Sequence, residues 1–279
     1  MPSRGLTAPT VGRGGAPASE RDAMEIIVPI KMVPDLVDEL VVNAEGTDLD
    51  RSTLTLRINE FDEHALEEAL GWKDRHGARV TVLALDTGDV DETLYTCLAK
   101  GADRAVKIMG DFAAGVSSHT MAAVLARVIT DLPHDLILAG VQAADDRDGQ
   151  VGVLLGATLG LPHVSVVTGV EPAGHAMVSV RQEYAGGLVG ELEVDLPAVL
   201  GIQAARQSPR YAPVSRVRQA MRTATLEEIA APAVDATAGS HVSRIAKPAV
   251  AGRAEILEGS PEEVADRLYT ILAERGLAK

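Results

Sequence analysis

The chain has 279 residues, of which 46% are hydrophobic and only 3% are aromatic. Its 26 Lys and Arg residues stand against 40 Asp and Glu residues, which gives a formal net charge of −14. A field of that sign repels nucleic acids and anionic lipid surfaces unless a local basic patch overrides it, and few aromatic residues remain for stacking on bases. We therefore expect a globular chain of one or two domains whose macromolecular partners are proteins.

Nothing in the sequence predicts a membrane span or a secretory signal. The longest apolar stretches, such as 151–161, are broken by glycines and reach about half of the roughly 20 residues that a spanning helix needs. Residues 1–23 lack an apolar segment, so we expect a disordered leader, with a mitochondrial transit peptide as the less favoured alternative. The single cysteine, Cys97, excludes an internal disulfide and indicates a reducing compartment, so we expect a cytoplasmic location.

From residue 25 onward, short β-rich runs alternate with amphipathic segments, a pattern typical of strands that cross over through helices into a parallel sheet. We expect buried strands at 26–30, 80–85, 105–109 and 136–139. We expect helices at 62–76, 89–100, 117–130 and 150–161. Between the first strand and the first helix, residues 41–58 predict a small β excursion with a turn at 43–46.

The pattern changes after residue 161. Three strand-like runs at 164–170, 177–181 and 188–194 are joined by Pro- and Gly-containing turns, which predicts an antiparallel addition to the sheet. Residues 231–248 are rich in Ala, Pro, Gly and Ser and predict an extended linker. A last helix is expected at 261–275, because a proline followed by two glutamates suits a helix N-terminus.

The strongest local signal for function is the polar loop between the strand at 136–139 and the helix at 150–161. Ligands of open parallel sheets settle beyond the carboxyl ends of the strands, where the N–H groups of the following helix attract phosphate. Gly149 and Gly152 would let a phosphate approach the backbone, and Gln150 offers an amide donor. The spacing matches neither a Walker loop nor the complete dinucleotide fingerprint, so an ordinary loop whose aspartates cap the helix remains an alternative.

Three other segments would face the same edge of a parallel sheet: 29–31, 59–62 and 86–88. Together with the polar loop they would line a crevice. Taken singly, each has a simpler interpretation, in which Asn59 and Asp62 are helix caps and Thr87 belongs to a turn.

The sequence predicts no catalytic residue and no metal site. Seven histidines without metal-ligand spacing are interpreted as surface or loop residues: His64, His76, His119, His134, His163, His175 and His241. Cys97 is expected in the core, and the pairs Glu67–Glu68 and Glu262–Glu263 are interpreted as solvated helix faces. Five arginines form a basic stretch that is either a solvated loop or a docking surface for an acidic partner: Arg206, Arg210, Arg216, Arg218 and Arg222.

Several short motifs, taken in order, resemble the β subunit of electron transfer flavoproteins. They are KMVPD at 31–35, NEFD at 59–62 ahead of ALEEA at 65–69, GADRA at 101–105, GVQA at 140–143 and PRY at 209–211. Their order and spacing match from about residue 25 to the C-terminal helix. The turn at Gly186–Gly187 followed by 196–199 also resembles that family's signature region, although Gln182 and Ala185 replace its usual basic and acidic residues.

The resemblance implies a mostly parallel α/β fold like that of the adenine nucleotide α-hydrolase group, with helices on both faces of the sheet. It also implies a partner α subunit that carries FAD near the interface and a nucleotide in this chain's own crevice. By position, the residues at that nucleotide would be Pro29, Asn59, Glu60, Phe61, Asp62, Thr87, Gly140, Gln142, Asp145, Gly149, Gln150 and Val151. We accordingly expect a leader at 1–23, a nucleotide-binding domain at 24–230, and a linker with a helical arm at 231–279 that contacts the partner.

The resemblance leaves two candidate ligands for this crevice. One is AMP, which is a structural ligand in housekeeping members of the family. The other is a second FAD, which accepts a hydride from NADH in bifurcating members. Residues 33–35 and 150–152 resemble the bifurcating or nitrogen-fixation-linked branches, whereas Asp145–Asp146 resembles the AMP-binding branch. The implied function is to carry electrons through FAD from dehydrogenases or NADH to a quinone reductase or another acceptor. In the loop that leads into 209–211, Ala204–Arg206 replaces the leucine with which housekeeping members dock dehydrogenases, so partner choice is expected to have diverged.

A stand-alone nucleotide-binding hydrolase or an ATP-dependent ligase of the same fold is the alternative function. Such ligases resemble one another in a Ser- and Gly-rich pyrophosphate loop after the first strand. Residues 31–35 lack that composition, which disfavours the ligase.

Overall fold

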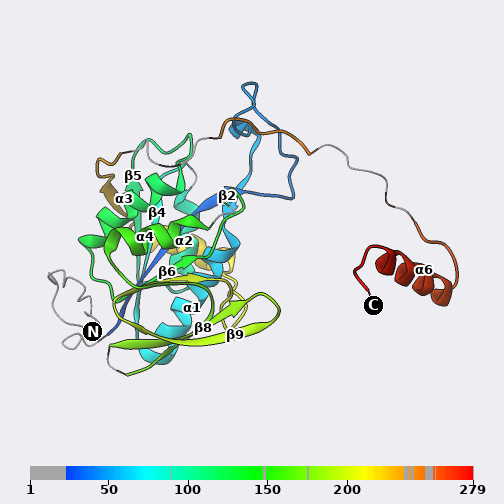
Figure 1. Ribbon diagram of the computed structural model, residues 1–279. Helices are drawn as coiled ribbons and strands as arrows, with labels where there is room; N and C mark the ends of the chain where they lie inside the picture. The colour runs from blue at the N-terminus through cyan, green and yellow to red at the C-terminus, as the bar shows by residue number, and fades with distance from the viewer. Residues whose placement is uncertain are drawn as a thin grey trace, which may run out of the picture.

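The protein is built around one large, mostly parallel sheet. The computed structural model describes residues 23–88, 90–146, 149–174, 176–235, 239, 242–248, 254 and 256–278. Within these residues, nine strands lie in the order β11-β5-β4-β1-β6-β10-β7-β8-β9 (Figure 1). Every neighbouring pair from β11 to β7 is parallel, whereas β8 runs antiparallel to both β7 and β9. Both the parallel sheet and the antiparallel addition predicted from the sequence are therefore confirmed.

The strands of the large sheet are β1 (Glu25–Ile30), β4 (Arg79–Leu85), β5 (Arg104–Met109), β6 (Leu136–Gly140), β7 (His163–Pro172), β8 (Met177–Tyr184), β9 (Leu188–Asp195), β10 (Ala198–Ile202) and β11 (Glu227–Ala230). The β excursion predicted for 41–58 is present in reduced form. Its strand β3 (Leu56–Ile58) pairs antiparallel with β2 (Met32–Pro34), which precedes the predicted range, and a single bridge joins Val42 to Leu49. A short 3-10 helix, η2 (Arg51–Thr53), lies between this bridge and β3.

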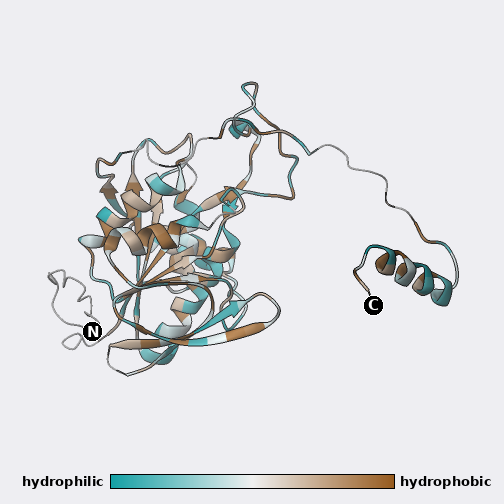
Figure 2. Ribbon diagram, in the orientation of Figure 1, coloured by the Kyte–Doolittle hydropathy of each residue, from teal (hydrophilic) through white to brown (hydrophobic). Residues whose placement is uncertain are grey.

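Helices cover both faces of the sheet. They are α1 (Glu60–His76) and α2 (Val90–Lys100) on one face, and α3 (Ser118–Thr130) and α4 (Gln150–Leu159) on the other. Successive side chains of β1 pack alternately against the helices on the two faces of the sheet, because neighbouring side chains of a strand point to opposite sides. Val28 packs into the core beneath α1 and α2, and Ile27 packs into the core beneath α3 and α4. Figure 2 shows hydrophobic residues concentrated along these central strands.

Helix α1 begins two residues before the predicted start. Asn59 rather than Asp62 occupies its N-cap position, and Gly77 ends it in the left-handed region with φ of 72°, as the sequence indicates. The interpretation of Glu67 and Glu68 as a solvated face is wrong, because their exposed fractions are only 5% and 2%. The reason is a later loop of the chain that covers this flank of the helix, a contact between distant segments that helical periodicity does not reveal.

Besides β2 and η2, three further elements were not predicted from the sequence. Strand β10 is fully buried and lies between β6 and β7, which precede it in the chain. Helix α5 (Val214–Thr223) has no buried residue, and its arginines hide its weak apolar pattern. Strand β11 is a charged edge strand. Each was missed because it is short and because its place depends on contacts with distant parts of the chain.

The C-terminal part of the chain leaves the sheet. Residues 242–248 pass over the excursion, where the N–H of Ile245 donates to the carbonyl of Gly46 at 2.7 Å and Lys247 pairs with Glu39 at 3.3 Å. Helix α6 (Pro261–Glu274) then stands away from the body (Figure 1) and has no buried residue. Its N-terminus carries a capping box between Ser260 and Glu263.

The predicted leader lies almost wholly outside the described residues, as do parts of the predicted linker. The domain boundaries therefore stay a prediction. Among the described helices, none combines the length and the apolar character needed to cross a membrane.

Replacing Leu138 in β6 with Ala should lower the free energy of unfolding by about 2–5 kcal/mol, because the side chain is completely buried and its loss leaves a cavity. The measurement is urea unfolding of the full-length chain followed by fluorescence of Trp72, the chain's single tryptophan, which is 2% exposed. Leu277→Ala is the control, since Leu277 is 73% exposed and its loss should cost less than about 0.5 kcal/mol. Equal losses in the two variants would contradict the assignment of β6 to the core.

Candidate functional site

A pocket opens at the carboxyl ends of β1 and β6, where the sequence predicts a crevice. Its lining residues are Pro29, Lys31, Asn59, Asp62, Met121, Ala139, Gly140, Val141, Gln142, Ala143, Asp146, Gly149 and Val151. The strand order explains its position. Strand β4 lies on one side of β1, and β6 lies on the other side, so the strand order reverses between β1 and β6. Ligands of open α/β sheets bind at such a reversal of strand order.

Strands β1 and β6 separate before they reach this edge. They pair only through Ile26–Leu136 and Ile27–Ile137, although β1 runs on to Ile30 and β6 to Gly140. The side chain of Asp62 fills the resulting gap. Its Oδ2 accepts the N–H of Lys31 at 2.8 Å, and its Oδ1 accepts the N–H of Gly140 at 3.0 Å. One carboxyl group therefore satisfies two backbone donors that have left the β ladder.

Asp62 is 5% exposed, and this burial raises the pKa of its carboxyl group to about 7. The hydrogen bonds from Lys31, Asn59 and Gly140 act in the opposite direction, and so does the charge of Lys31. Burial dominates because a charged carboxylate loses its hydration in this position. Near neutral pH the pocket therefore contains a carboxyl group that both gains and loses a proton easily.

The simpler interpretation of Asn59 and Asp62 as helix caps is wrong for Asp62, which lies within the first turn of α1, and holds for Asn59 only in its position. Asn59 occupies the N-cap position of α1, but its side chain makes no capping hydrogen bond. Instead its Nδ2 donates to the carbonyl oxygen of Gln142 at 2.9 Å. Both side chains therefore point away from α1 and bind the chain around β6.

The polar loop after β6 is held from two sides. Lys31, at the end of β1, pairs with Asp145 at 2.7 Å, and the hydroxyl of Ser118 at the start of α3 donates to Asp146. The backbones of Ala143 and Asp146 also exchange two hydrogen bonds of 3.1 Å. The loop is thus a fixed wall of the pocket in the part that the structure describes, which excludes Arg147 and Asp148.

Two glycines allow the backbone to come this close. A Cβ atom on Gly140 would lie 2.3 Å from Oδ1 of Asp62, and one on Gly149 would lie 2.5 Å from the carbonyl oxygen of Val141. Gly149 also has φ of 65° and occupies the N-cap position of α4. Because it has no side chain, it supplies no capping oxygen to the first-turn N–H groups of α4, which are the kind of donors that bind phosphate.

The pocket is narrow and continues into a wider one. Its free volume is about 20 Å³, room for little more than one water molecule. The adjoining outer pocket has a volume of about 240 Å³ and shares Asn59, Gln142 and Ala143 with it. The outer pocket is also lined by Glu60, Phe61, the segment 33–37, Arg57, Ile58 and Ala144.

Most of the site residues expected from the sequence gather at these two pockets. Pro29, Asn59, Asp62, Gly140, Gln142, Gly149 and Val151 line the inner one, and Glu60 and Phe61 line the outer one. Asp145 lies beside them through its ion pair with Lys31, and Gln150 opens α4 next to Gly149. Thr87 lines neither pocket, and its buried Oγ1 has no hydrogen-bond partner among the described residues.

One bulky member of the wall, Met121, was not expected from the sequence. Lys31 and Asp146 were not named among the individual binding residues, but they belong to the segment 29–31 and to the polar loop, both of which the sequence places at the crevice. Met121 comes from α3, and no local pattern could have indicated its position.

Two residues outside the pocket test other expectations. Cys97 is 1% exposed in α2, which confirms it as a core residue, and burial raises the pKa of its thiol to about 12. His163 corrects the expectation of surface histidines, because it is half-buried at the start of β7 and burial lowers its pKa. Gly152 and Gly156 of α4 make room for this side chain, since a Cβ on Gly152 would lie 3.1 Å from its Nε2 and one on Gly156 would lie 2.8 Å from its Cβ.

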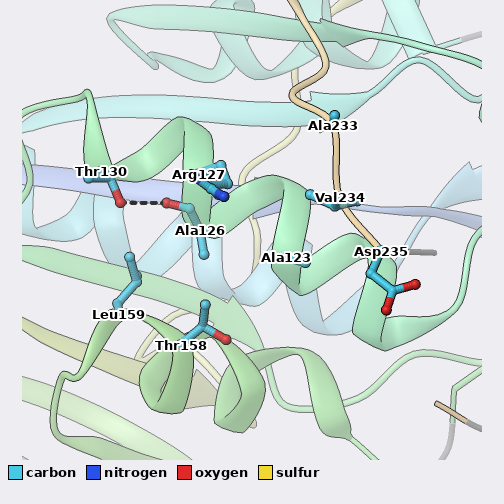
Figure 3. Close-up of a pocket in the computed structure, with 9 residues that line it drawn as sticks. All are labelled: Ala123, Ala126, Arg127, Thr130, Thr158, Leu159, Ala233, Val234 and Asp235. Carbon is cyan, nitrogen blue, oxygen red and sulfur yellow. Dashed lines mark hydrogen bonds between the residues drawn. The ribbon is translucent and has the colours of Figure 1, made fainter. Parts of the chain in front are cut away.

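A larger hollow of about 500 Å³ lies on the flank of the molecule between α3, α4 and residues 233–235 (Figure 3). Figure 3 shows a wall of mostly small side chains, among them Ala123, Ala126 and Thr158. This hollow is distant from the strand ends in the fold, and none of the expected site residues lines it. We therefore place the candidate site at the strand ends.

A family model described as "Electron transfer flavoprotein domain" matches residues 47–234 of the chain, which is more than half of its length. The chain belongs to the electron transfer flavoprotein family. The match includes α1, β6, the polar loop and α4, and so covers most of the pocket wall.

Individual relatives place the chain among the β subunits of this family. It is 33% identical to the electron transfer flavoprotein subunit beta of Methylophilus methylotrophus over 260 residues, which cover 90% of this chain and 98% of that protein. It is 36% identical to the subunit of the same name from Clostridium acetobutylicum over 199 residues, covering 70% and 74%. It is also 31% identical to the acryloyl-CoA reductase electron transfer subunit gamma of Anaerotignum propionicum over 192 residues, covering 67% and 71%.

The function is accordingly that of an electron transfer flavoprotein β subunit. The alternative function, a stand-alone hydrolase or ligase of the same fold, finds no support in these relatives, all of which carry names of electron transfer subunits.

Asp62 should leave a signature in the pH dependence of stability. Its pKa is about 7 in the folded chain, well above the 3.8 of an unperturbed aspartate, so between pH 4 and pH 7 the folded chain binds the extra proton. Stability then falls as the pH rises through this window, because the unfolded state binds fewer protons. We expect the free energy of unfolding of the wild type, minus that of Asp62→Asn, to decrease from pH 4 to pH 7 and to level off above about pH 8.

The measurement is urea unfolding of both full-length chains at a series of pH values. Asp135→Asn is a useful comparison, because Asp135 is also buried and accepts a backbone N–H, that of Glu25, but lies at the opposite end of the strands. A difference curve for Asp62→Asn that stays flat from pH 4 to pH 8 would contradict the elevated pKa.

Proposed function

We propose that this β subunit holds one AMP in the crevice between β1 and β6 and assembles with an α subunit that carries the FAD. The observation that supports this most is the junction of the two pockets, where an uncapped helix N-terminus faces the same space as carboxyl, amide and carbonyl groups. The first-turn N–H groups of α4 suit a phosphate. The amide and carboxyl groups of Asn59, Asp62 and Gln142 suit the hydroxyl and amino groups of a nucleoside.

The size of the site favours AMP over a second FAD. Pockets that enclose small ligands have volumes of roughly 300–1,000 Å³. The outer pocket, at about 240 Å³, falls below that range, and the inner one adds little to it. A complete FAD is much larger than AMP and would need correspondingly more space than these two pockets offer.

Electron carriage would be the task of the assembled heterodimer. The FAD supplies the redox chemistry, and the protein supplies its position and electrostatic surroundings. We propose that electrons arrive from dehydrogenases or NADH and leave to a quinone reductase or another acceptor. In this arrangement the AMP-binding residues of the chain have a structural role, because they fix the strand ends against which the partner subunit packs.

Two exposed apolar features suit a protein partner. Leu36 and Val37, at the edge of the outer pocket, are 63% and 87% exposed. Helix α6 displays Leu268, Tyr269 and Leu272 with nothing covering them in the described residues. Such helices bind by laying an apolar face into a groove, so we propose that the α subunit covers α6 and the outer-pocket edge together.

A different surface suits a redox partner. Helix α5 exposes Arg216, Arg218 and Arg222. These arginines form no ion pair within the described part of the chain, although the net charge of the chain is −14. Tyr211, just before the helix, is 78% exposed and Val214 is 57% exposed. An exposed aromatic residue beside uncompensated arginines is typical of a docking surface for an acidic protein. We propose this surface for the electron donor, and we keep the cytoplasm as the expected location.

The nucleotide content of the heterodimer tests the proposed ligand. The chain is co-expressed with its α subunit, purified as a complex and denatured, and the released nucleotides are identified by absorbance and mass. We expect one FAD and one AMP per heterodimer. Two FAD molecules would overturn AMP in favour of a bifurcating flavoprotein, and a colourless monomer with ATP would overturn the proposed function altogether.

The variant Gly140→Ala should lower the AMP content roughly tenfold or more while the FAD content stays unchanged. A Cβ there would lie 2.3 Å from Oδ1 of Asp62 and 2.9 Å from the α1 backbone, so the pocket must distort. Gly71→Ala is the matched control, since a Cβ there meets only the flexible end of Arg75. Normal AMP content in Gly140→Ala would exclude this crevice as the site.

The docking surface is tested by the triple variant Arg216→Gln, Arg218→Gln, Arg222→Gln. Purified dehydrogenases of the same organism are assayed for reduction of the heterodimer's flavin at low and moderate ionic strength. For the donor that reduces the wild type, we expect the second-order rate constant at low salt to fall about tenfold or more, because opposite charges steer association. We also expect its dependence on salt to become weaker. An unchanged rate constant and salt dependence would exclude α5 as the docking surface.

A further inference from the structure

The loop at 203–213, which joins β10 to α5, lies along one flank of α1 and is bound there through its backbone. The N–H of Ala205 donates to Nδ1 of His64 at 3.2 Å, and the N–H of Arg206 donates to Oε2 of Glu68 at 3.1 Å. The N–H of Arg210 donates to Oε2 of Glu67 at 2.9 Å. The three acceptors are spaced three and four residues apart on α1, so they form one row on the helix surface.

The side chain of Arg210 strengthens this attachment. Its Nε lies 3.1 and 3.0 Å from the two carboxylate oxygens of Glu67, and its Nη2 lies 2.9 Å from Oε1 of Glu67 and 2.8 Å from Asp74. A guanidinium that binds a carboxylate through two N–H groups is fixed in orientation as well as in distance. The carboxylates of Glu67 and Asp74 accordingly raise the pKa of Arg210.

A second group of charges holds the start of the loop. Arg206 pairs with Glu171 at the end of β7, and Arg75 lies 3.9 Å from both Glu171 and Glu68. Glu68 is 2% exposed, and burial raises the pKa of its carboxyl group. Buried carboxylates are costly, and apolar residues of similar size would pack this flank of α1 at least as stably. The cost indicates that Glu67 and Glu68 are there to bind the loop.

The attached loop sets the position of the next helix in the chain. Ala212, 8% exposed, is buried directly after the Arg210 contact, whereas Tyr211 on one side and Val214 on the other point into solvent. Helix α5 begins at Val214 and lies against α2, so the attached loop fixes the position of its first turn. Its exposed arginines have no ion pair of their own in the described residues.

We propose that Glu67 and Glu68 are positioning residues for electron-donor docking: they clamp the 203–213 loop onto α1 and so fix the position of Tyr211 and of the first turn of α5, where the cationic face begins. The inference rests on the proposed use of that surface for the donor. The clamp holds the surface in its binding orientation before the partner arrives, which lowers the entropic cost of association.

The double variant Glu67→Gln, Glu68→Gln tests the clamp in the purified heterodimer. Gln keeps the shape of Glu but loses the charge, so we expect amide hydrogen exchange at Ala205, Arg206 and Arg210 to accelerate roughly ten- to a hundredfold. Arg210→Lys keeps the charge but loses the bidentate hydrogen bonds to Glu67. It should accelerate exchange of the backbone amide at position 210, to a smaller extent than the double variant does. Glu63→Gln is the matched control, because Glu63 is a carboxylate of the same helix that pairs with Lys100 and not with the loop.

The second readout is the steady-state reduction of the flavin by the donor that reduces the wild type. We expect the double variant to raise the KM for the donor several-fold and to leave kcat and the FAD and AMP contents unchanged. Unchanged exchange at the three amides would overturn the clamp. Accelerated exchange with an unchanged KM would overturn its role in docking. If the triple arginine variant also leaves the rate unchanged, the proposed docking surface itself fails, so the two failures are distinguishable.

Discussion

The gap between the carboxyl ends of β1 and β6 is the constraint on which the rest of the structure depends. The two strands pair only near their beginnings, and their last N–H groups must find acceptors elsewhere. Asp62 supplies both acceptors with one carboxyl group, and Asn59 binds the loop that continues from β6. The crevice therefore exists because the sheet opens there, and it has a defined shape because the start of α1 closes it.

Helix α1 connects the functional parts of the chain. Its N-terminal residues build the pocket, its apolar side packs on the sheet, and its row of His64, Glu67 and Glu68 holds the loop before α5. The candidate pocket and the proposed docking surface are thus attached to the same helix of 17 residues.

The sequence predicts the parts of the fold that depend on local patterns. Continuous apolar runs indicated β1, β4 and β6, because strands covered on both faces carry no alternation. Ligands of open α/β sheets bind beyond the carboxyl ends of the strands. That rule predicts one crevice lined by Pro29, Asn59, Asp62, Gly140 and Gly149, as the structure has it. It could not predict β10, which enters the sheet between two earlier strands, nor the burial of Glu67 and Glu68, which depends on a loop more than 130 residues later in the chain. Met121 of α3 reaches the pocket for the same reason, through packing between elements.

Hydrogen exchange of the purified heterodimer, with its AMP retained and after its removal, tests the location of the ligand site most directly. With AMP bound, the amides of Lys31, Gly140 and the first turn of α4 from Gln150 should exchange more slowly than in the AMP-free complex, because the nucleotide covers the strand ends and accepts the free N–H groups of the helix. The α3–α4 flank around Ala123 and Thr158 should exchange equally in both states. Slower exchange on that flank, with no change at the strand ends, would contradict the assignment of the crevice between β1 and β6 as the nucleotide site.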